Sequence, residues 1–134
     1  MTVNPVLWDI DERGVATVTL NRPEVNNAYD AGLINGVLAA MDELGSKPNL
    51  TVALVQGGCF GGGTGVISAC DVVIAADNAL FSITEVRWGL TAAIIIPQLC
   101  DAIGVRQVRR YALTGERFGA EEARRIGLAH EVVP

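Results

Sequence analysis

Glycine is concentrated in one short stretch of this chain, and that stretch limits the folds that the chain can adopt. The sequence GGCFGGGTG, residues 57–65, holds six of the 15 glycines. The apolar residues 52–55 precede it and the apolar residues 66–70 follow it. This pattern predicts a buried strand that ends in bare backbone and turns into a short helix, which ends near Cys70.

Three known glycine motifs do not fit this stretch. The phosphate-binding motif GxxxxGK[ST] needs a lysine that residues 57–65 lack, and no GxGxxG dinucleotide motif can be placed there. A GxSxG nucleophile elbow on residues 61–65 would put its serine at Gly63. Two interpretations stay open. The glycines expose N–H groups at a helix start, where an oxygen that gains negative charge can bind, or they only let a helix pack tightly on a strand.

The rest of the pattern alternates strands with helices and predicts an α/β fold with mainly parallel strand pairing. The turn cluster at residues 11–14 predicts a hairpin, and Asp30 is expected to cap the first helix. We expect strands at residues 6–10, 15–20, 51–56, 71–76, 80–83 and 129–133. We expect the other helices at residues 30–44, 91–103, 105–113 and 119–126.

Composition and charge argue against several classes of protein. The chain has 134 residues, of which 50% are hydrophobic, which is enough for the core of one domain. Its net charge of −5 opposes sequence-independent binding of nucleic acid. No apolar window is long enough to span a membrane, and the N-terminus lacks the pattern of an export signal. The sequence therefore predicts a cytoplasmic protein without a nucleic acid or membrane partner.

The cysteines and the single histidine do not predict a metal site. Cys59, Cys70 and Cys100 form no CxxC pair, and His130 has no neighbour at ligand spacing. We expect Cys59 and Cys70 to pack as small hydrophobic residues. We expect His130 to be a packed or surface residue rather than a catalytic base.

Glu85, in the segment ITEVRWGL, is the candidate catalytic carboxylate. Its apolar neighbours Ile83, Val86, Trp88 and Leu90 favour a site shielded from water, where a carboxylate can act as a general acid or base. Composition alone leaves a second interpretation, a carboxylate on the solvated surface.

Three ordered segments resemble signature regions of the enoyl-CoA hydratase/isomerase (crotonase) family. They are NRPEVNNA (21–28), GGCFGGGTGVISACDVVIAADNALFSITEVRWGL (57–90) and LTGERFGAEEARRIGLAHEVVP (113–134). The resemblance covers nearly the whole chain. It implies a single α/β domain over residues 1–134, an incomplete crotonase-like spiral of ββα turns. It also implies an acyl-CoA thioester as substrate, an enolate stabilised by two backbone N–H groups, and no cofactor, because coenzyme A is part of the substrate.

The resemblance also implies roles for individual residues. The N–H of Gly62, in the middle of the GGG block, would be one oxyanion donor, so the glycine stretch would form half of an oxyanion hole. Glu85 would be the acid/base. The implied substrate neighbours are Val25, Asn26, Gly61, Gly62 and Thr84, of which Val25 and Asn26 belong to the segment on the CoA adenine side.

The family pattern is altered at Gly65, where most of the hydratases carry another glutamate. A single carboxylate favours an isomerase or a one-glutamate hydratase, because the usual route of water addition shares the water between two carboxylates. The motifs are most similar to those of hydratases of branched glutaconyl-type CoA esters, such as 3-methylglutaconyl-CoA or isohexenylglutaconyl-CoA.

Two parts of the family pattern are missing from this chain. One is a strand with an A-G-A-D-like loop that supplies the second oxyanion N–H, and the other is the C-terminal helices that cover the site and build homotrimers or dimers of trimers. We expect a missing segment near residues 50 and 51, with Leu50 and Thr51 too far apart for one peptide bond. The alternative to an acyl-CoA hydratase/isomerase is a truncated, non-catalytic crotonase-like domain that only binds CoA or a protein partner.

Overall fold

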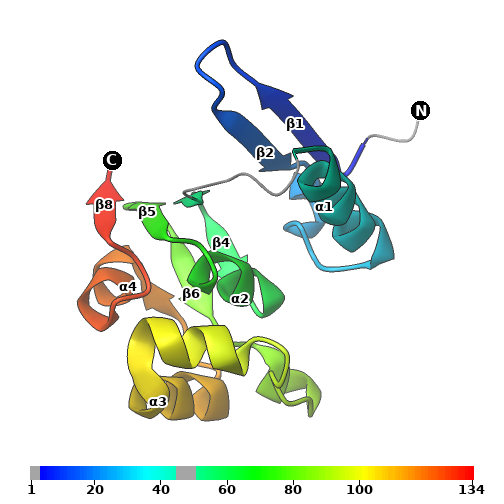
Figure 1. Cartoon of the computed structure of the whole chain (residues 1–134). Coiled ribbons are helices and arrows are strands. Elements are labelled where there is room, and N and C mark those ends of the chain that lie inside the picture. Colours follow the sequence, from blue (N-terminus) through cyan, green and yellow to red (C-terminus); the bar gives the residue numbers. More distant parts are fainter. Residues whose placement is uncertain (1–3, 45–50) are drawn as a thin grey trace. The chain divides into compact units, whose positions relative to one another are not determined.

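The computed structural model describes residues 4–44 and 51–134, and the chain divides into two compact units, residues 1–49 and residues 50–134 (Figure 1). The break that we expect between Leu50 and Thr51 lies outside the described residues.

The first unit is a β-hairpin with one helix packed against it (Figure 1). β1 (Val6–Ile10) and β2 (Ala16–Leu20) pair antiparallel, so the predicted hairpin is confirmed. Asp11 holds the turn between them, because its Oδ1 accepts the N–H groups of Arg13 and Val15. The chain then passes through η1 (Pro23–Val25) into α1 (Ala31–Leu44).

Asp30 caps α1, as the sequence predicts. Its Oδ1 accepts the N–H of Leu33 at 2.9 Å, which satisfies one of the free donors at the helix start. Leu33 and Ala40 are buried against Val6 of β1. The buried face is narrower than the apolar pattern of the sequence suggests. The large apolar side chains that stay exposed on α1 are Ile34, Leu38 and Met41.

The second unit contains two three-stranded sheets. In one sheet β5 (Val72–Ala76) lies between β3 (Val52–Val55) and β8 (Glu131–Val133), and all three strands are parallel. In the other sheet β6 (Leu80–Ser82) pairs parallel with β4 (Gly58–Phe60) and antiparallel with β7 (Phe118–Gly119). The predicted α/β class with mainly parallel pairing is confirmed, but β4 lies inside the glycine stretch, where we expected no strand.

The α-helices of the second unit follow the predicted order. They are α2 (Gly62–Ser68), α3 (Ile96–Thr114) and α4 (Ala120–Ile126). The short η2 (Glu85–Trp88) is not among the predicted elements. The predicted start of α3 at residue 91 is wrong, because residues 91–95 are not helical. Pro97 stands in the first turn of α3, where the N–H that proline lacks would have no helical acceptor.

α3 consists of two helices joined at Gly104. This confirms the predicted boundary between a helix that ends at residue 103 and one that begins at residue 105. Gly104 has φ 77° and ψ 150°, which is not helical and is a region that residues with a Cβ rarely adopt. Nothing lies within 4 Å of the position that a Cβ would take, so the backbone angle is the only constraint there.

We therefore predict that Gly104→Ala lowers the free energy of unfolding by about 1–3 kcal/mol through backbone strain. Denaturant unfolding of the variant measures this change. Arg106→Ala on the exposed side of the same helix is the control, with an expected change within about 0.5 kcal/mol. A Gly104→Ala variant as stable as the control would contradict the prediction.

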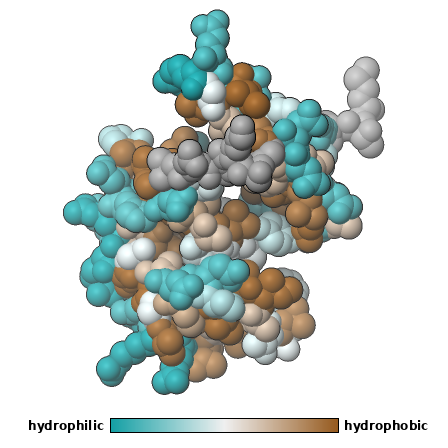
Figure 2. Space-filling model, in the orientation of Figure 1, coloured by the Kyte–Doolittle hydropathy of each residue, from teal (hydrophilic) through white to brown (hydrophobic). Residues whose placement is uncertain are grey.

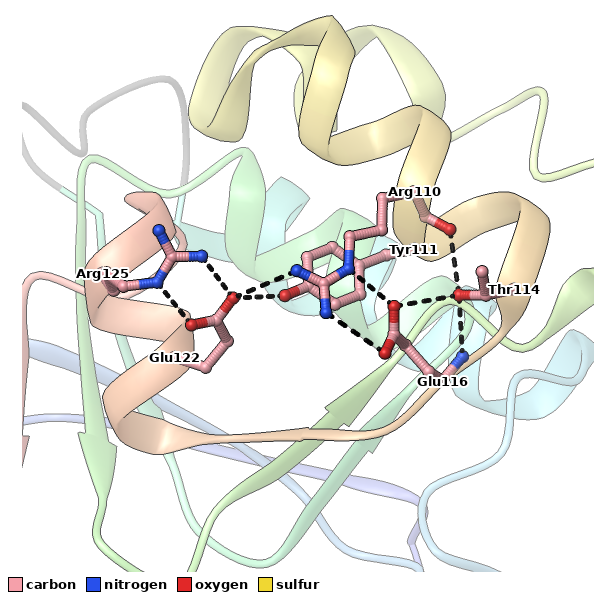
Figure 3. A network of polar contacts seen from close by, with 6 residues as sticks. All are labelled: Arg110, Tyr111, Thr114, Glu116, Glu122 and Arg125. Atoms are coloured by element: carbon pink, nitrogen blue, oxygen red, sulfur yellow. Dashed lines mark hydrogen bonds and ion pairs between the residues drawn. The ribbon is translucent and has the colours of Figure 1, made fainter.

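Charged side chains join the end of α3 to α4 (Figure 3). Tyr111 is fully buried, its ring lies 4.3 Å from that of Phe118, and its hydroxyl donates to Glu122. The Arg125 guanidinium donates two hydrogen bonds of 2.6 Å to the same carboxylate. The bonds from Arg125 and then from Tyr111 lower the pKa of Glu122 to about 2. Burial, followed by the bond to Glu122, raises the pKa of Tyr111 to about 12.

This network predicts a loss of stability in acid. The pKa of Glu122 in the folded protein lies below its ordinary value of 4.5, so its contribution is complete above pH 4.5 and disappears as the pH falls towards about 2. Glu122→Gln should therefore unfold more easily than wild type near neutral pH, and the difference should shrink in that acid range.

Glu121→Gln is the matched control, because Glu121 is 77% exposed and lies 3.7 Å from Arg124. Denaturant midpoints measured between pH 2 and pH 7 check both variants. A Glu122→Gln difference that did not change with pH would contradict the account.

The surface carries large apolar side chains, which appear brown in Figure 2. In the second unit Leu54, Trp88, Leu90 and Ile94 are 80%, 79%, 65% and 88% exposed. Three of these four residues follow Glu85 closely in the sequence. No helix within residues 4–44 and 51–134 is long and apolar enough to cross a membrane.

Candidate active site

The glycine stretch makes a tight turn between β4 and α2. Gly61 has φ 52° and ψ −125°, a backbone conformation that favours glycine. Its N–H donates to the carbonyl of Ser82 in β6 at 2.9 Å. Its own carbonyl accepts the N–H of Thr64 at 2.9 Å and the Thr64 hydroxyl at 2.7 Å. The turn is therefore fixed both to the sheet and to the first turn of α2.

The turn leaves two backbone donors at the start of α2. The first N–H groups of a helix have no acceptor within it, and Gly62 and Gly63 are the first two residues of α2. The hydrogen bonds that hold the turn use the N–H groups of Gly61 and Thr64 instead. The Gly62 N–H is thus free of helical hydrogen bonding, which is what an oxyanion donor requires.

The carboxylate of Glu85 lies against this turn. A Cβ on Gly61 would stand 3.0 Å from Oγ1 of Thr84 and 3.2 Å from Oε1 of Glu85. Any larger side chain at position 61 would have to displace one of them. The structure thus brings together four of the predicted site residues, namely Gly61, Gly62, Thr84 and Glu85. Their chemical roles stay predictions.

One oxygen of this carboxylate has no partner. Oε2 of Glu85 is buried, and no hydrogen-bond donor reaches it from residues 4–44 or 51–134. A buried polar atom without a partner loses the stabilisation that water would give it, so such atoms are uncommon outside functional sites. An oxygen in this state can accept a proton or a hydrogen bond from a bound molecule.

The apolar neighbours of Glu85 shield it less than the sequence suggests. Ile83 is buried, but Val86, Trp88 and Leu90 are exposed. The expectation is therefore wrong for these three residues, which are exposed, while Glu85 at the start of η2 faces the glycine turn. The Glu85 carboxylate is shielded by its contact with the turn at Gly61 instead of by the predicted apolar side chains.

Ile95 occupies the space beside Gly65. A Cβ on Gly65 would lie 2.1 Å from Cγ2 and 2.5 Å from Cβ of Ile95, so no side chain fits at position 65. Gly65 lies inside α2, whereas Gly61 precedes the helix with a non-helical backbone, so the two glycines meet different requirements. Ile95 is not among the site residues predicted from the sequence, although it lies in a run of three isoleucines at residues 94–96.

The predicted substrate neighbours Val25 and Asn26 belong to the first unit, where both are exposed. A cavity of about 360 Å³ in this unit is lined by Pro5, Asn21, Arg22, Glu24, Asp30 and Gly32. Within it, Arg22 forms an ion pair with Asp30. The bond from the Leu33 N–H and then the bond from Arg22 lower the pKa of Asp30. Val25 and Asn26 are not among the lining residues.

Cys59 and Cys70 pack as the sequence predicts, and His130 has a structural contact. Cys59, Cys70 and Cys100 are free thiols packed against the core, and burial raises the pKa of Cys59 to about 12. Nδ1 of His130 accepts the N–H of Val73 at 3.1 Å, so the ring has a structural partner. The parts of the chain that the structure describes hold no cluster of three or more residues able to bind a metal ion.

Comparison with known proteins gives one family. A family model described as "Enoyl-CoA hydratase/isomerase" matches residues 35–134. The "Hydroxycinnamoyl-CoA hydratase-lyase" of Pseudomonas fluorescens is 41% identical over 90 residues, which are 66% of this chain and 32% of that protein. The "Probable enoyl-CoA hydratase echA8" of Mycobacterium tuberculosis is 30% identical over 182 residues, which cover 100% of this chain and 70% of that protein.

The same fold occurs in solved structures. A crystal structure of an enoyl-CoA hydratase from Shewanella pealeana superposes with a TM-score of 0.90 at 24% identity, covering 98% of this chain and 69% of that one. The matched part of this chain spans about a third of the length of the Pseudomonas relative. The mycobacterial alignment is 182 residues long, whereas this chain has 134, so that relative holds internal residues without a counterpart here.

The contact between Gly65 and Ile95 predicts a coupled pair of substitutions. Gly65→Ala forces a methyl group into Ile95 and should lower the free energy of unfolding by about 1–3 kcal/mol. Ile95→Ala makes room for that methyl group, so the double variant should lose less than the sum of the two single losses. Chemical denaturation of the four proteins measures the coupling, and losses that add within about 0.5 kcal/mol would contradict it.

Proposed function

The chain belongs to the enoyl-CoA hydratase/isomerase family, and from this premise we propose that the protein acts on an enoyl-CoA thioester through an enolate, with Glu85 as the acid/base. The observation that carries the proposal is the position of Glu85. Its carboxylate lies against Gly61, and its Oε2 is buried without a hydrogen-bond partner among the described residues. The free N–H of Gly62 belongs to the residue that follows Gly61.

The proposed reaction moves one proton. Glu85 takes a proton from the carbon next to the thioester carbonyl, and the electron pair of the broken C–H bond passes to the carbonyl oxygen. The N–H of Gly62 donates to that oxygen as its negative charge develops, which contributes about 3–4 kcal/mol to the stability of such a transition state. Glu85 then returns the proton to the far end of the conjugated system, which shifts the double bond.

The contact between Gly65 and Ile95 supports a mechanism with one carboxylate. Ile95 fills the space beside position 65, so no second acid can stand there without repacking. A single acid/base suffices to move a proton between two carbons. The proposal therefore favours an isomerase, or a hydratase that activates its water with Glu85 alone.

The second oxyanion donor is proposed to come from residues missing from this sequence. Of the two free N–H groups at the start of α2, that of Gly62 is the proposed oxyanion donor. The length of the mycobacterial alignment supports a missing internal segment. Its position near residues 50 and 51, and a second donor within it, remain proposals that the complete gene sequence can test.

The acyl group and the assembly are also proposals. The Pseudomonas relative is named for hydroxycinnamoyl-CoA, a conjugated acyl-CoA. The motifs of this chain favour a branched glutaconyl-type ester, such as 3-methylglutaconyl-CoA or isohexenylglutaconyl-CoA. We further propose a cytoplasmic lyase or isomerase of fatty acid metabolism that assembles as a homotrimer or a dimer of trimers. The names of the relatives do not favour the alternative of a non-catalytic domain, because both are named as enzymes.

Replacement of the acid/base tests the proposal. In the full-length protein, Glu85→Gln should lower kcat on a 2-enoyl-CoA or 3-enoyl-CoA by about 10²-fold or more, because the amide cannot take up the proton. The loss should appear in kcat rather than in KM. Spectrophotometric assay of hydration and of double-bond migration measures both constants.

Glu121→Gln serves as the control, since its exposed side chain lies in α4. It should keep the wild-type rate and unfold at the same denaturant concentration as wild type. An unchanged rate in Glu85→Gln would remove this residue from the mechanism.

A further inference from the structure

One carbonyl oxygen ties together the segment that carries Glu85. The oxygen of Gly115, at the end of α3, accepts three hydrogen bonds. Oγ of Ser82 donates at 2.9 Å, Nε of Arg87 at 3.1 Å and Nη2 of Arg87 at 2.6 Å. Ser82 itself is fully buried. We refer to Ser82, Arg87 and Gly115 as the carbonyl clamp.

The carbonyl clamp binds the chain before and after Glu85 in the sequence. Ser82 precedes Glu85 by three residues at the end of β6, and Arg87 follows it by two residues in η2. The clamp therefore fixes the two ends of the short turn from which Glu85 projects.

Gly115 also packs against the side chains of Val86 and Arg87 in η2, which limits the movement of η2. A Cβ at position 115 would stand 3.0 Å from Cγ1 of Val86 and 3.2 Å from Nε of Arg87. A side chain at position 115 would therefore press on the side chains of Val86 and Arg87. The clamp is a tight packing contact as well as a set of hydrogen bonds.

Oε2 of Glu85 is buried and unpaired within the described residues, which gives the carbonyl clamp a role: it keeps the Glu85 side chain from moving into water. A buried carboxylate oxygen without a donor is more stable in water, so a loosely held turn would let the side chain swing out. The bonds within η2 are backbone bonds from the N–H of Leu90 to Glu85 and from that of Gly89 to Val86. The guanidinium of Arg87 is the charged donor that ties this turn to α3, and charge-assisted hydrogen bonds are stronger than neutral ones.

We propose that Arg87 is a positioning residue, which holds the Glu85 carboxylate against the glycine turn through the carbonyl of Gly115. Arg87 acts on Glu85 through the backbone and is not itself a catalytic residue. The inference rests on the proposed function for its effect on the rate, whereas its effect on the turn stands without it.

Hydrogen exchange and kinetics of the full-length protein test this role together. Arg87→Met removes both donors and keeps the aliphatic stem, Arg87→Lys keeps the charge, and Arg124→Met is the control on α4. In Arg87→Met the amides of Gly89 and Leu90 should exchange about tenfold faster or more, with the amides of β5 unchanged.

Displacement of the Glu85 carboxylate in the Arg87 variants should lower kcat. We expect kcat on an enoyl-CoA to fall about tenfold or more in Arg87→Met with KM within about twofold, since a carboxylate displaced by even 1 Å loses rate. Arg87→Lys should recover part of both losses. Ser82→Ala removes the third donor and should speed hydrogen exchange of the Gly89 and Leu90 amides.

Each failure has a distinct meaning. Unchanged exchange at Gly89 and Leu90 in Arg87→Met, or faster exchange spread equally over β5, would overturn the clamp whatever the activity. A local rise in exchange with an unchanged kcat would refute the positioning role. An unchanged rate in Glu85→Gln would instead refute the proposed function, and the exchange data would still decide whether the clamp exists.

Discussion

A carboxylate oxygen enclosed in protein without a hydrogen-bond donor gives up the hydration that it would have in water. Among the residues that the structure describes, Oε2 of Glu85 has no such donor, and the surrounding backbone must hold it there. Two contacts do so: the turn at Gly61 lies so close to the carboxylate that a side chain there would press on Thr84 or Glu85, and Gly115 binds the chain on either side of Glu85. These contacts come from the turn between β4 and α2, from the end of β6 and from the end of α3.

The glycine stretch serves several purposes, which explains why so many glycines stand together. Gly61 makes a turn that other residues rarely adopt and leaves room for Glu85. Gly62 offers an N–H without a helical acceptor. Gly65 admits the side chain of Ile95. The two interpretations of the stretch are therefore compatible: the contact of Gly65 with Ile95 supports tight packing, and the donor role of Gly62 stays a prediction.

Much of this arrangement can be predicted from the sequence, and the rest depends on contacts between distant residues. Hydrophobic periodicity and capping residues predict the hairpin, α1 with its Asp30 cap, β5 and the break at Gly104. The short strands β4 and β7 have no periodicity to reveal them. Ile95 beside Gly65, and Ser82 and Arg87 on the Gly115 carbonyl, are missed because each contact joins segments many residues apart. The family pattern identifies Glu85, but only the coordinates show its unpaired oxygen.

The central claim is that the free oxygen of Glu85 and the N–H of Gly62 face the same thioester. A crystal structure of the full-length protein with an unreactive acyl-CoA analogue tests this most directly. The account predicts the thioester oxygen at about 2.7–3.1 Å from the Gly62 nitrogen, with Oε2 of Glu85 at the carbon next to it. An acyl group bound away from Gly62, or a Glu85 carboxylate paired with another side chain of the protein in that complex, would contradict the account.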